Sequence, residues 1–345
     1  MSPDSKNNGP SISQRRIRDL SEAFKGKRVA IVGDLMVDRY FWGTVSRVSP
    51  EAPVPVVEIS SEHARLGGAA NVANNIQTLG GDPVLIGLVG DDHAGEVFLE
   101  LLREQGLTTS GIIVDPSRRT TSKTRVIAHG QHVVRIDQET KADCSEQNEH
   151  RIVDEVRKAI HSIDAMILED YNKGAITRTV IRETIEIARN NKTIITVDPK
   201  FEHFFEYKSV TVFKPNRRET EEVLGGRLRT EEDLIKAGRR ILSELRADNV
   251  LLTRGEDGMS LFEAGGMMTH IKPVADNVQD VSGAGDTVIA TLTMALAADA
   301  TIQEAAMLSN YAGGVVVGSV GIVPIKLEEL VEVALCHSKN SQVSS

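Results

Sequence analysis

Short β-branched runs alternate with longer amphipathic segments along most of this chain, and no other feature constrains its fold as strongly. Runs such as RVAIVGD, PVLIGLVGD, DAMILED and TIITVDP are separated by helical patterns such as HAGEVFLELLREQG and TRTVIRETIEIARNN. This alternation is typical of βαβ units, in which each crossover returns the chain to the same edge of a parallel sheet. Strands continue at VTVFKPN and NVLLTRG, and helical segments follow near 284–298 and 301–317. We therefore predict one α/β domain with a mostly parallel sheet and helices on both faces.

Two regions interrupt this alternation. Residues 43–66 contain three prolines and alternating apolar residues, and residues 120–137 resemble two strands joined at His129-Gly130-Gln131. We expect them to form a small β-flap, or lid, outside the main sheet. Because exposed strand edges favour pairing with another chain, we also predict a homodimer through the flap. The polar ends, residues 1–12 and 338–345, are expected to be tails of a domain that spans residues 13–337.

Composition excludes several classes of protein. The 40 Lys plus Arg against 49 Asp plus Glu give a net charge of −9, which disfavours nucleic-acid binding and means that an anionic substrate needs a local basic pocket. The two cysteines, Cys144 and Cys336, are too few and too far apart for a disulfide framework or a zinc site. The N-terminal residues lack the apolar core of a signal peptide, and no apolar run is long enough for a membrane span. We expect a cytoplasmic protein.

The motif DVSGAGDT, followed by the helical run VIATLTMALAA, is the strongest chemical signal. Gly283, Ala284 and Gly285 place minimal side chains where a helix begins, so free backbone N–H groups and the helix dipole favour an anion such as phosphate. Asp286 in the first turn is then placed to accept a proton from an attacking hydroxyl. The alternative is that Asp286 only caps the helix.

Asn216 and Glu219 follow the strand VTVFKPN, at the edge where open α/β sheets bind ligands. A carboxylate beside polyphosphate requires a bridging cation or water, which points to Mg²⁺. As an isolated pattern, however, Asn-x-x-Glu is more often a capping box than a ligand site.

Three further motifs are weaker. LTRGEDG is a strand that runs into a glycine turn and by itself indicates only a hairpin. In GGAAN, two glycines permit close backbone approach and the amide offers a donor and an acceptor for hydroxyls, although a tight start of a helix explains the motif equally well. Asp34 and Asp38 follow the first strand and suit bidentate binding of a polyol, against the alternative of a solvated loop.

The order of these motifs resembles the ribokinase-like PfkB carbohydrate kinases over about residues 27–335. Within that family, RVSPEAPVPVVE, LGGAANVANNI, VDPK and DVSGAGDT are most similar to the kinases of D-glycero-β-D-manno-heptose 7-phosphate. Most PfkB kinases have Thr at the position of Val281, and this departure fits the heptose group while leaving the glycines intact. The resemblance implies a ribokinase-like fold with a lid.

The resemblance also implies an activity, namely ATP-dependent phosphorylation of the anomeric hydroxyl to give the 1,7-bisphosphate. That reaction belongs to ADP-heptose and lipopolysaccharide core synthesis, and Mg²⁺ is the implied cofactor. Bifunctional members of the group continue into a nucleotidyltransferase domain. Because this chain ends soon after its last helical segment, the resemblance implies a stand-alone kinase.

Site roles follow from the resemblance, position by position. Asp286 would be the catalytic base, and the anion hole would comprise Gly283, Ala284 and Gly285. The ATP side would comprise Asn216, Glu219, Thr253, Gly255, Gly258 and Asn310, with Glu219 holding Mg²⁺ through water. The sugar would contact Asp34, Asp38, Gly67, Gly68 and Asn71. Its distal phosphate needs cations, for which the candidates are Arg47, Arg125, Arg135 and Lys173, with Arg135 foremost.

Two alternatives stay open. A PfkB kinase for another acceptor, such as fructose 6-phosphate or a ribose-like sugar, would use the same phosphoryl-transfer residues and differ only in its sugar pocket. A sugar or nucleotide sensor without catalysis is the alternative from a different class, since a fold does not fix a function.

Overall fold

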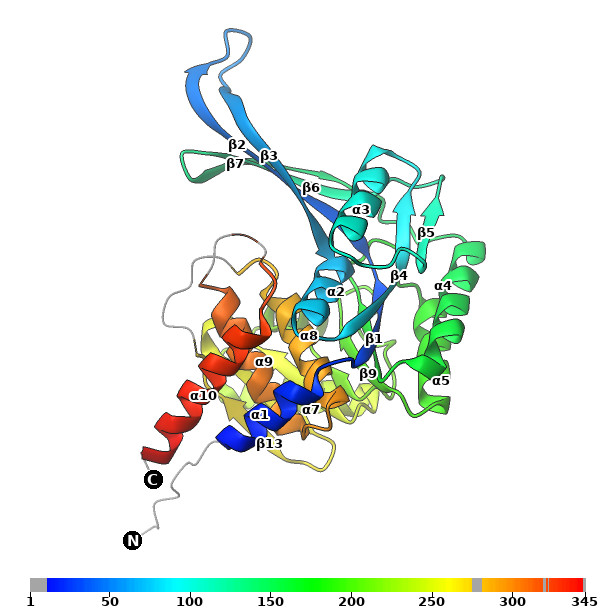
Figure 1. Cartoon of the computed structure of the whole chain (residues 1–345), viewed down its shortest axis with the longest axis vertical. Helices are drawn as coiled ribbons and strands as arrows, with labels where there is room; N and C mark the ends of the chain where they lie inside the picture. The colour runs from blue at the N-terminus through cyan, green and yellow to red at the C-terminus, as the bar shows by residue number, and fades with distance from the viewer. Residues whose placement is uncertain (1–10, 275–280, 319–320, 322, 344–345) are drawn as a thin grey trace.

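The computed structural model describes residues 11–274, 281–318, 321 and 323–343, and over these residues a nine-stranded sheet forms the centre of the protein (Figure 1). Its strands, in spatial order, are β13 (Met268–Ile271), β12 (Met259–Glu263), β11 (Asn249–Thr253), β10 (Val212–Phe213), β9 (Ile194–Asp198), β8 (Ala165–Glu169), β1 (Arg28–Gly33), β4 (Asp82–Gly90) and β5 (Ile112–Asp115). Neighbours from β11 to β5 are parallel, and only the β11–β12 and β12–β13 pairs are antiparallel. The predicted mostly parallel sheet is confirmed.

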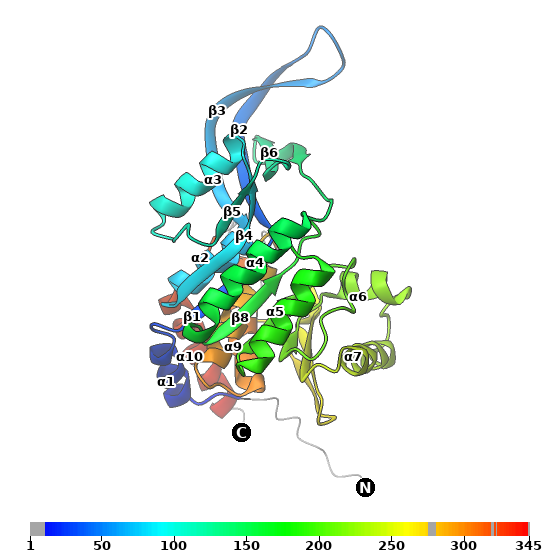
Figure 2. The ribbon, with the colours of Figure 1, turned by 90° about the vertical axis from the view of Figure 1, so that its right-hand side faces the viewer.

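Helices cover both faces of this sheet because its inner strands alternate their apolar side chains between two cores. Val29 and Ile31 of β1 point into one core, and Ala30 and Val32 point into the other. The first core is completed by α1 (Gln14–Ala23), α2 (Ala69–Thr78), α3 (His93–Glu104), α8 (Ala284–Ala297), α9 (Ile302–Val316) and α10 (Leu327–Val343). The second is completed by α4 (Glu146–Ala159), α5 (Arg178–Asn190) and α7 (Glu231–Leu245), and Figure 2 shows α4 and α5 on that face. The remaining short elements are α6 (Arg217–Leu224), η1 (Ile160–Ser162) and η2 (Gly255–Asp257).

The helix that carries the DVSGAGDT motif is buried almost from end to end. Residues 286–297 of α8 are all buried, which explains why its sequence is apolar on every side. Because α8 packs between α2 and α9 and against β8 and β9, its N-terminus is fixed relative to the carboxyl ends of those strands.

A second sheet of four strands forms the predicted flap. Its order is β3 (Pro55–Gly68), β2 (Leu35–Val48), β6 (Thr121–Ala128) and β7 (Gln131–Gln138), and the β2–β3 hairpin projects away from the main sheet (Figure 2). The turn between β6 and β7 is made by His129 and Gly130, both with positive φ. The first flap strand begins at Leu35 rather than at residue 43, because buried residues 35–37 carry the chain directly from β1 into the flap.

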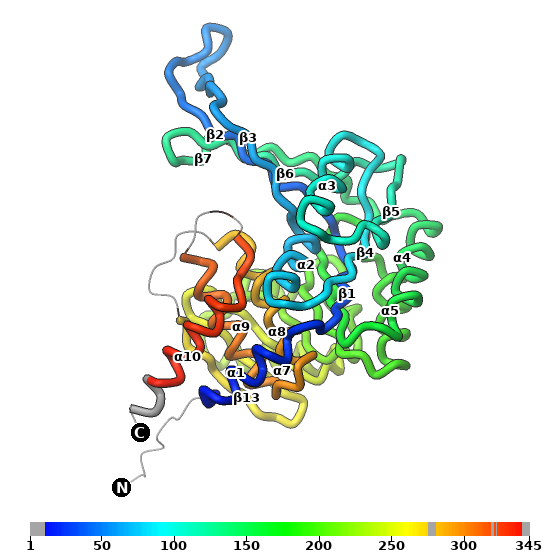
Figure 3. Tube along the Cα trace, viewed as in Figure 1, coloured from blue at the N-terminus to red at the C-terminus, as the bar shows by residue number. Residues whose placement is uncertain are grey.

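The prediction of a C-terminal tail from residue 338 is wrong for residues 338–343, which are the last turns of α10. Leu330, Ala334 and Ser338 are spaced four apart and all buried, so the apolar face of the helix extends past residue 337. The Ser338 hydroxyl donates to the Ile12 carbonyl at 2.9 Å, and Ile12, which the sequence placed in the N-terminal tail, is also buried. Figure 3 shows α1 and α10 side by side near the two ends of the chain.

Among the helices described, none is long and apolar enough to cross a lipid bilayer.

Candidate functional site

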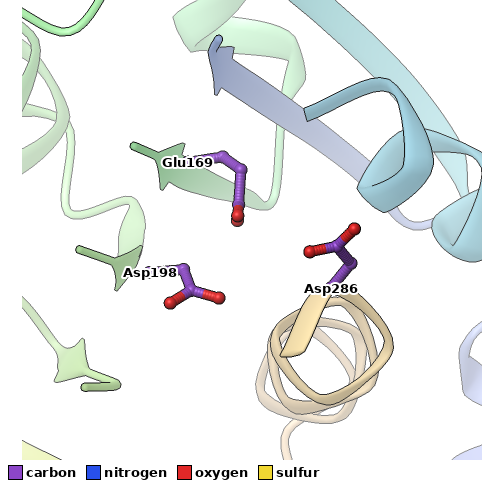
Figure 4. Close-up of side chains that lie close together, drawn as sticks. All are labelled: Glu169, Asp198 and Asp286. Atoms are coloured by element: carbon purple, nitrogen blue, oxygen red, sulfur yellow. The ribbon is translucent and has the colours of Figure 1, made fainter. Parts of the chain in front are cut away.

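Four acidic side chains lie where three parallel strands end and α8 begins. Asp34 follows β1, Glu169 ends β8, Asp198 ends β9, and Asp286 is in the first turn of α8. All four are buried, and one oxygen from each of Glu169, Asp198 and Asp286 lies within 4.8 Å of the others (Figure 4). Asp286, predicted from its motif alone, therefore belongs to a larger acidic group at the carboxyl edge of the sheet.

Asp286 is held by two side-chain donors. The Tyr171 hydroxyl donates to its Oδ1 at 2.6 Å, and the Asn71 amide donates to its Oδ2 at 2.7 Å. Burial raises the pKa of Asp286 to about 6, although these two hydrogen bonds act in the opposite direction. Because its hydrogen bonds are to these side chains and α8 has no side-chain cap, Asp286 does not cap the helix, and its role as a proton acceptor stays a prediction.

The predicted anion hole lies at the start of α8, and its role stays a prediction. Gly283 is the N-cap with φ of 78°, a left-handed conformation that glycine adopts without strain. A Cβ on Gly285 would lie 3.5 Å from Asp198 Oδ2 and 3.7 Å from Lys214 Nζ, so the backbone approaches both charges closely. Ala284 is the first residue of the helix, and its N–H already bonds to the Val281 carbonyl. Asp280 of the motif lies outside the described residues.

Two lysines accompany the carboxylates. Lys214, which follows β10, forms an ion pair with Asp198 at 2.7 Å, and Lys200, which follows β9, pairs with Glu219. Burial opposes the charged form of Lys214, but Asp198 outweighs it and raises the pKa of the ammonium group. Burial, followed by the charges of Asp198 and Asp286, raises the pKa of Glu169 well above its ordinary value.

The pair Asn216 and Glu219 forms the capping box, which was the alternative interpretation of its pattern. Glu219 N–H donates to Asn216 Oδ1 at 2.8 Å, and Asn216 N–H donates to Glu219 Oε2 at 2.9 Å. Because the other Glu219 oxygen pairs with Lys200, both of its oxygens have partners in this structure. A role for Glu219 in Mg²⁺ binding stays a prediction.

Asp34 holds a loop of the backbone. Its Oδ2 accepts from the N–H groups of Tyr171 at 2.8 Å and Lys173 at 3.0 Å, and its Oδ1 accepts from Ala175 at 3.0 Å. These bonds fix the segment that carries Tyr171, so Asp34 has a structural role whether or not it also contacts a sugar.

Of the other predicted sugar-binding residues, Asn71 contacts Asp286, whereas Asp38, Gly67 and Gly68 lie on the flap strands β2 and β3 near the main sheet. Asp38 forms an ion pair with Arg125 across neighbouring flap strands, and a Cβ on Gly67 would lie 2.2 Å from Asp38 Oδ2. Glycine at position 67 is therefore required for Asp38 to reach this place. Gly68 then caps α2, whose third residue is Asn71.

The residues predicted to bind the nucleotide lie at the end of β11, in the turn after it, at the start of α6 and in α9. Thr253 ends β11 and bridges to Asn216, and the turn after it contains Gly255 and Gly258, both with positive φ. Asn310, in α9, donates to the Lys272 carbonyl at 2.8 Å. The structure thus brings Thr253 next to the capping box of α6. The roles of these residues in nucleotide binding stay predictions.

The cations proposed for a distal phosphate differ in exposure and partners, although Arg125 and Arg135 are register partners on β6 and β7. Arg47 is exposed on the projecting hairpin, and Arg135 is exposed on β7 and paired with Asp137 at 2.9 Å. Lys173 is paired with Glu139 at 2.8 Å. Arg125, by contrast, lines a hollow of about 60 Å³ between the flap and the main domain. The other residues around this hollow are Tyr40, Trp42, His63, Arg65, Ile127, His132, Ser282 and Gly321.

Sequence reasoning missed several members of the site. These are Glu169, Tyr171, Asp198, Lys200 and Lys214, together with His63, Arg65 and His132 at the hollow. A usable signal existed for the first five, because LEDY, VDPK and FKPN each place charged or hydroxyl groups just after a buried strand, where α/β sheets bind ligands. The three residues at the hollow face it only through the pairing of the flap strands.

Comparison with known proteins is consistent with this geometry. The model of the pfkB family carbohydrate kinases matches residues 27–328. The bifunctional protein HldE of Geobacter sulfurreducens is 43% identical over 87% of this chain and 61% of its own length. HldE of Pelobacter propionicus is 40% identical over 95% of this chain and 67% of its own length. The chain thus spans about three-fifths to two-thirds of the length of these relatives.

Solved structures show the same fold at low sequence identity. Phosphofructokinase-2 from Escherichia coli, in complex with potassium, superposes with a TM-score of 0.76 at 20% identity, covering 91% of this chain and 99% of that one. Arabidopsis thaliana ribokinase, complexed with ribose and ATP, superposes with a TM-score of 0.69 at 18% identity. The match covers 90% of this chain and 99% of that chain.

The bonding of Asp34 leads to a stability prediction. Asp34→Asn replaces one carboxylate oxygen by an NH₂ group, which leaves at least one buried backbone N–H of the 171–175 loop without an acceptor. We expect the free energy of unfolding to fall by about 2–3 kcal/mol. Chemical denaturation measures this, with Asp91→Asn at an exposed position as the control. Equal stability of Asp34→Asn and the wild type would show that the loop does not depend on this carboxylate.

Proposed function

The chain belongs to the pfkB family of carbohydrate kinases and is an ATP-dependent sugar kinase, and from this premise we propose that its acceptor is D-glycero-β-D-manno-heptose 7-phosphate. The product would be the 1,7-bisphosphate, a precursor of ADP-heptose in lipopolysaccharide core synthesis. The proposal is supported by the HldE relatives, to which this chain is about 40% identical over most of its length. It also rests on the heptose-type motifs of the sequence.

The observation that carries the chemistry is Asp286, buried at the N-terminus of α8 with a pKa raised to about 6. The anomeric oxygen attacks the γ-phosphorus of ATP, the bond from that phosphorus to the β–γ bridging oxygen breaks, and ADP leaves. Asp286 takes the proton of the attacking hydroxyl. The backbone N–H groups at the start of α8 would hold the transferred phosphoryl group, where the helix dipole favours its negative charge.

We propose that ATP is used as its Mg²⁺ complex. Such an ion, when bound, neutralises the charge of the phosphate oxygens during transfer. The carboxylates at the carboxyl edge of the sheet fit a hard cation, because they are oxygen donors and Glu169 Oε2 is buried without a hydrogen-bond partner among the described residues. The nucleotide itself would lie along Thr253, Gly255 and Gly258 and reach Asn310.

The hollow under the flap supports a phosphorylated acceptor. Arg125 and Arg65 line it together with His63 and His132, and none of the described lining residues is acidic. Arg125 also pairs with Asp38, which links the distal end of the acceptor site to the group of residues around Asn71. These residues support an acceptor with a dianion at one end and a reactive hydroxyl at the other, as heptose 7-phosphate has.

The raised pKa of Asp286 leads to a pH prediction. Asp286 accepts a proton only when ionised, so kcat/KM should rise with pH, reach half of its maximum near pH 6 and then level off. Tyr171→Phe removes a hydrogen bond that stabilises the carboxylate, so we expect the midpoint to move upward by about 1–2 pH units. Steady-state kinetics between pH 4.5 and about 9 measure both.

Asp286→Asn is the reference for this profile. It keeps the shape of the side chain but removes the base, so kcat should fall by about 10²–10⁴-fold at every pH. A wild-type profile that is flat across pH 5 to about 7, or an Asp286→Asn variant with near-normal turnover, would contradict the role of Asp286 as the base.

The acceptor is tested by incubating the enzyme and Mg-ATP with a panel of sugars and identifying the products by ³¹P NMR. Heptose 7-phosphate should give the highest kcat/KM, and removing its 7-phosphate should lower that value by about 10- to 100-fold for each charge-assisted hydrogen bond that the phosphate makes. Arg125→Met should abolish this discrimination while the KM for ATP barely changes. Arg135→Met, at the position favoured by the sequence, is the comparison.

The same panel decides between the alternatives. Preferential phosphorylation of fructose 6-phosphate or ribose would keep the kinase assignment and replace the acceptor. Binding of sugar and ATP without any phosphorylated product would instead indicate a sensor.

We also propose a homodimer through the flap. The edge strand β7 is exposed along its whole length, and Val134 and Ile136, two residues apart, place apolar side chains on one of its faces. Light scattering at micromolar concentration should report a dimer for the wild type and a monomer for Val134→Lys/Ile136→Lys. Val114→Lys, an exposed apolar position on β5 outside the flap, should remain dimeric. A monomeric wild type would contradict the proposal.

A further inference from the structure

Lys123, on the flap strand β6, is a half-buried cation without a partner of opposite charge. Among the described residues, no carboxylate forms an ion pair with its ammonium group and no acceptor takes a hydrogen bond from it. Its Nζ lies 5.2 Å from the centre of the Tyr171 ring, a favourable contact with a neutral group. Charges that proteins withdraw from water are usually paired, so this ammonium group is a candidate ligand for an anion.

The charged groups around Lys123 do not compensate it, because they compensate one another. Arg125, two residues along β6, is paired with Asp38, and Lys173 is paired with Glu139 at 2.8 Å. Three cations therefore face two carboxylates, and one positive charge is left over on Lys123.

The pKa of Lys123 agrees with this balance. Burial lowers the pKa of its ammonium group, the charge of Asp38 raises it, and the charges of Lys173 and Arg125 lower it further. Asp137, a more distant carboxylate, is paired with Arg135 at 2.9 Å.

The pairing of the flap strands places Lys123 between the hollow and Asp286. Lys123 and Arg125 are two residues apart on β6 and so share one face of the strand. Arg125 lines the hollow, whereas Lys123 is nearer the end at which β6, running parallel to β2, approaches the main sheet. At that end it meets Tyr171, whose hydroxyl bonds to Asp286 at 2.6 Å.

We infer that Lys123 is a specificity-determining residue, whose ammonium group binds the distal phosphate of the acceptor together with Arg125. The inference rests on the proposed phosphorylated acceptor. A phosphate dianion supplies the negative charge that the group around Lys123 lacks, and hydrogen bonds between ions are stronger than those between neutral groups. An acceptor that extends from the hollow to Asp286 passes along this side chain.

The experiment compares heptose 7-phosphate with unphosphorylated heptose as acceptors for the full chain with Mg-ATP. Lys123→Met keeps the length of the side chain and removes its charge, so kcat/KM for the 7-phosphate should fall by about 10- to 100-fold. The value for unphosphorylated heptose should stay within about twofold, and the KM for ATP should barely change. Lys123→Arg, which keeps the charge, should recover most of the activity toward the 7-phosphate.

The two acceptors separate phosphate binding from a structural role of Lys123. An ammonium group that only holds the Tyr171 ring would, when lost, lower kcat/KM for both acceptors alike, because both depend on the same proton acceptor. Because one dianion is bound by both cations, Lys123→Met/Arg125→Met should show the same preference between the acceptors as Arg125→Met alone.

Arg39→Met is the matched control on the flap. Arg39 follows Asp38 on β2, so its side chain lies on the opposite face, where it pairs with Glu62 of β3. Its loss removes the same charge from the flap and should leave both kcat/KM values unchanged. Thermal unfolding of every variant checks the fold, and we expect Lys123→Met to keep a Tm near that of the wild type, since the lost contact with Tyr171 is offset by removal of an unpaired charge.

Two results with Lys123→Met would overturn the inference while leaving the proposed acceptor in place. They are an equal loss of kcat/KM for both acceptors and an unchanged preference for the 7-phosphate. A wild type that uses heptose equally well with and without its 7-phosphate would show instead that the proposed acceptor is wrong, and the role of Lys123 would fall with it. If the wild type prefers another sugar phosphate, the same comparison with that sugar decides the role of Lys123.

Discussion

The geometry of the site depends first on the buried carboxylate of Asp34, which accepts three backbone N–H groups from the loop after β8. That loop carries Tyr171, whose hydroxyl reaches Asp286 on a helix more than a hundred residues later in the chain. Asp34 is also the residue between β1 and β2, so the same side chain lies where the main sheet continues into the flap. The Asp34 carboxylate thus connects the flap, the loop after β8 and, through Tyr171, Asp286. Hydrogen bonds from N–H groups to an ionised carboxylate are stronger than those between neutral groups.

The carboxylates around Asp286 illustrate how a fold maintains an arrangement that is unfavourable by itself. Burial raises the pKa of Glu169 and of Asp286, and the charge of Asp198 adds to this effect at both. The surrounding apolar core, with α8 buried along its length, provides the rigidity that keeps these groups in place. Preorganised charge of this kind lowers a reaction barrier because the groups need no rearrangement when charge develops in the transition state.

How far the sequence predicts the site depends on whether a feature is local. Gly283 to Asp286 could be predicted because a glycine turn and a carboxylate in the next helical turn are neighbours in the chain. Asn216 and Glu219 are equally local, yet their pattern is shared by ligand sites and capping boxes, and the structure shows the capping box. Glu169 carries a local signal, a carboxylate at the end of a buried strand, but its position beside Asp286 could not be derived, because it requires β8 to lie next to β9 and α8 to pack against both. Ser338 was misassigned because its hydroxyl bonds to Ile12, whose position cannot be derived from local composition.

The flap also contacts the carboxyl edge of the main sheet through the ring of Tyr171. The Tyr171 ring lies close to the ammonium group of Lys123 on β6, at 5.2 Å, and to that of Lys200 after β9, at 5.1 Å. A cation over an aromatic ring is favourable, and the attraction is stronger where water is excluded. The ring whose hydroxyl bonds to Asp286 therefore contacts a cation of the flap and a cation of the main domain, so this one side chain links the flap to Asp286.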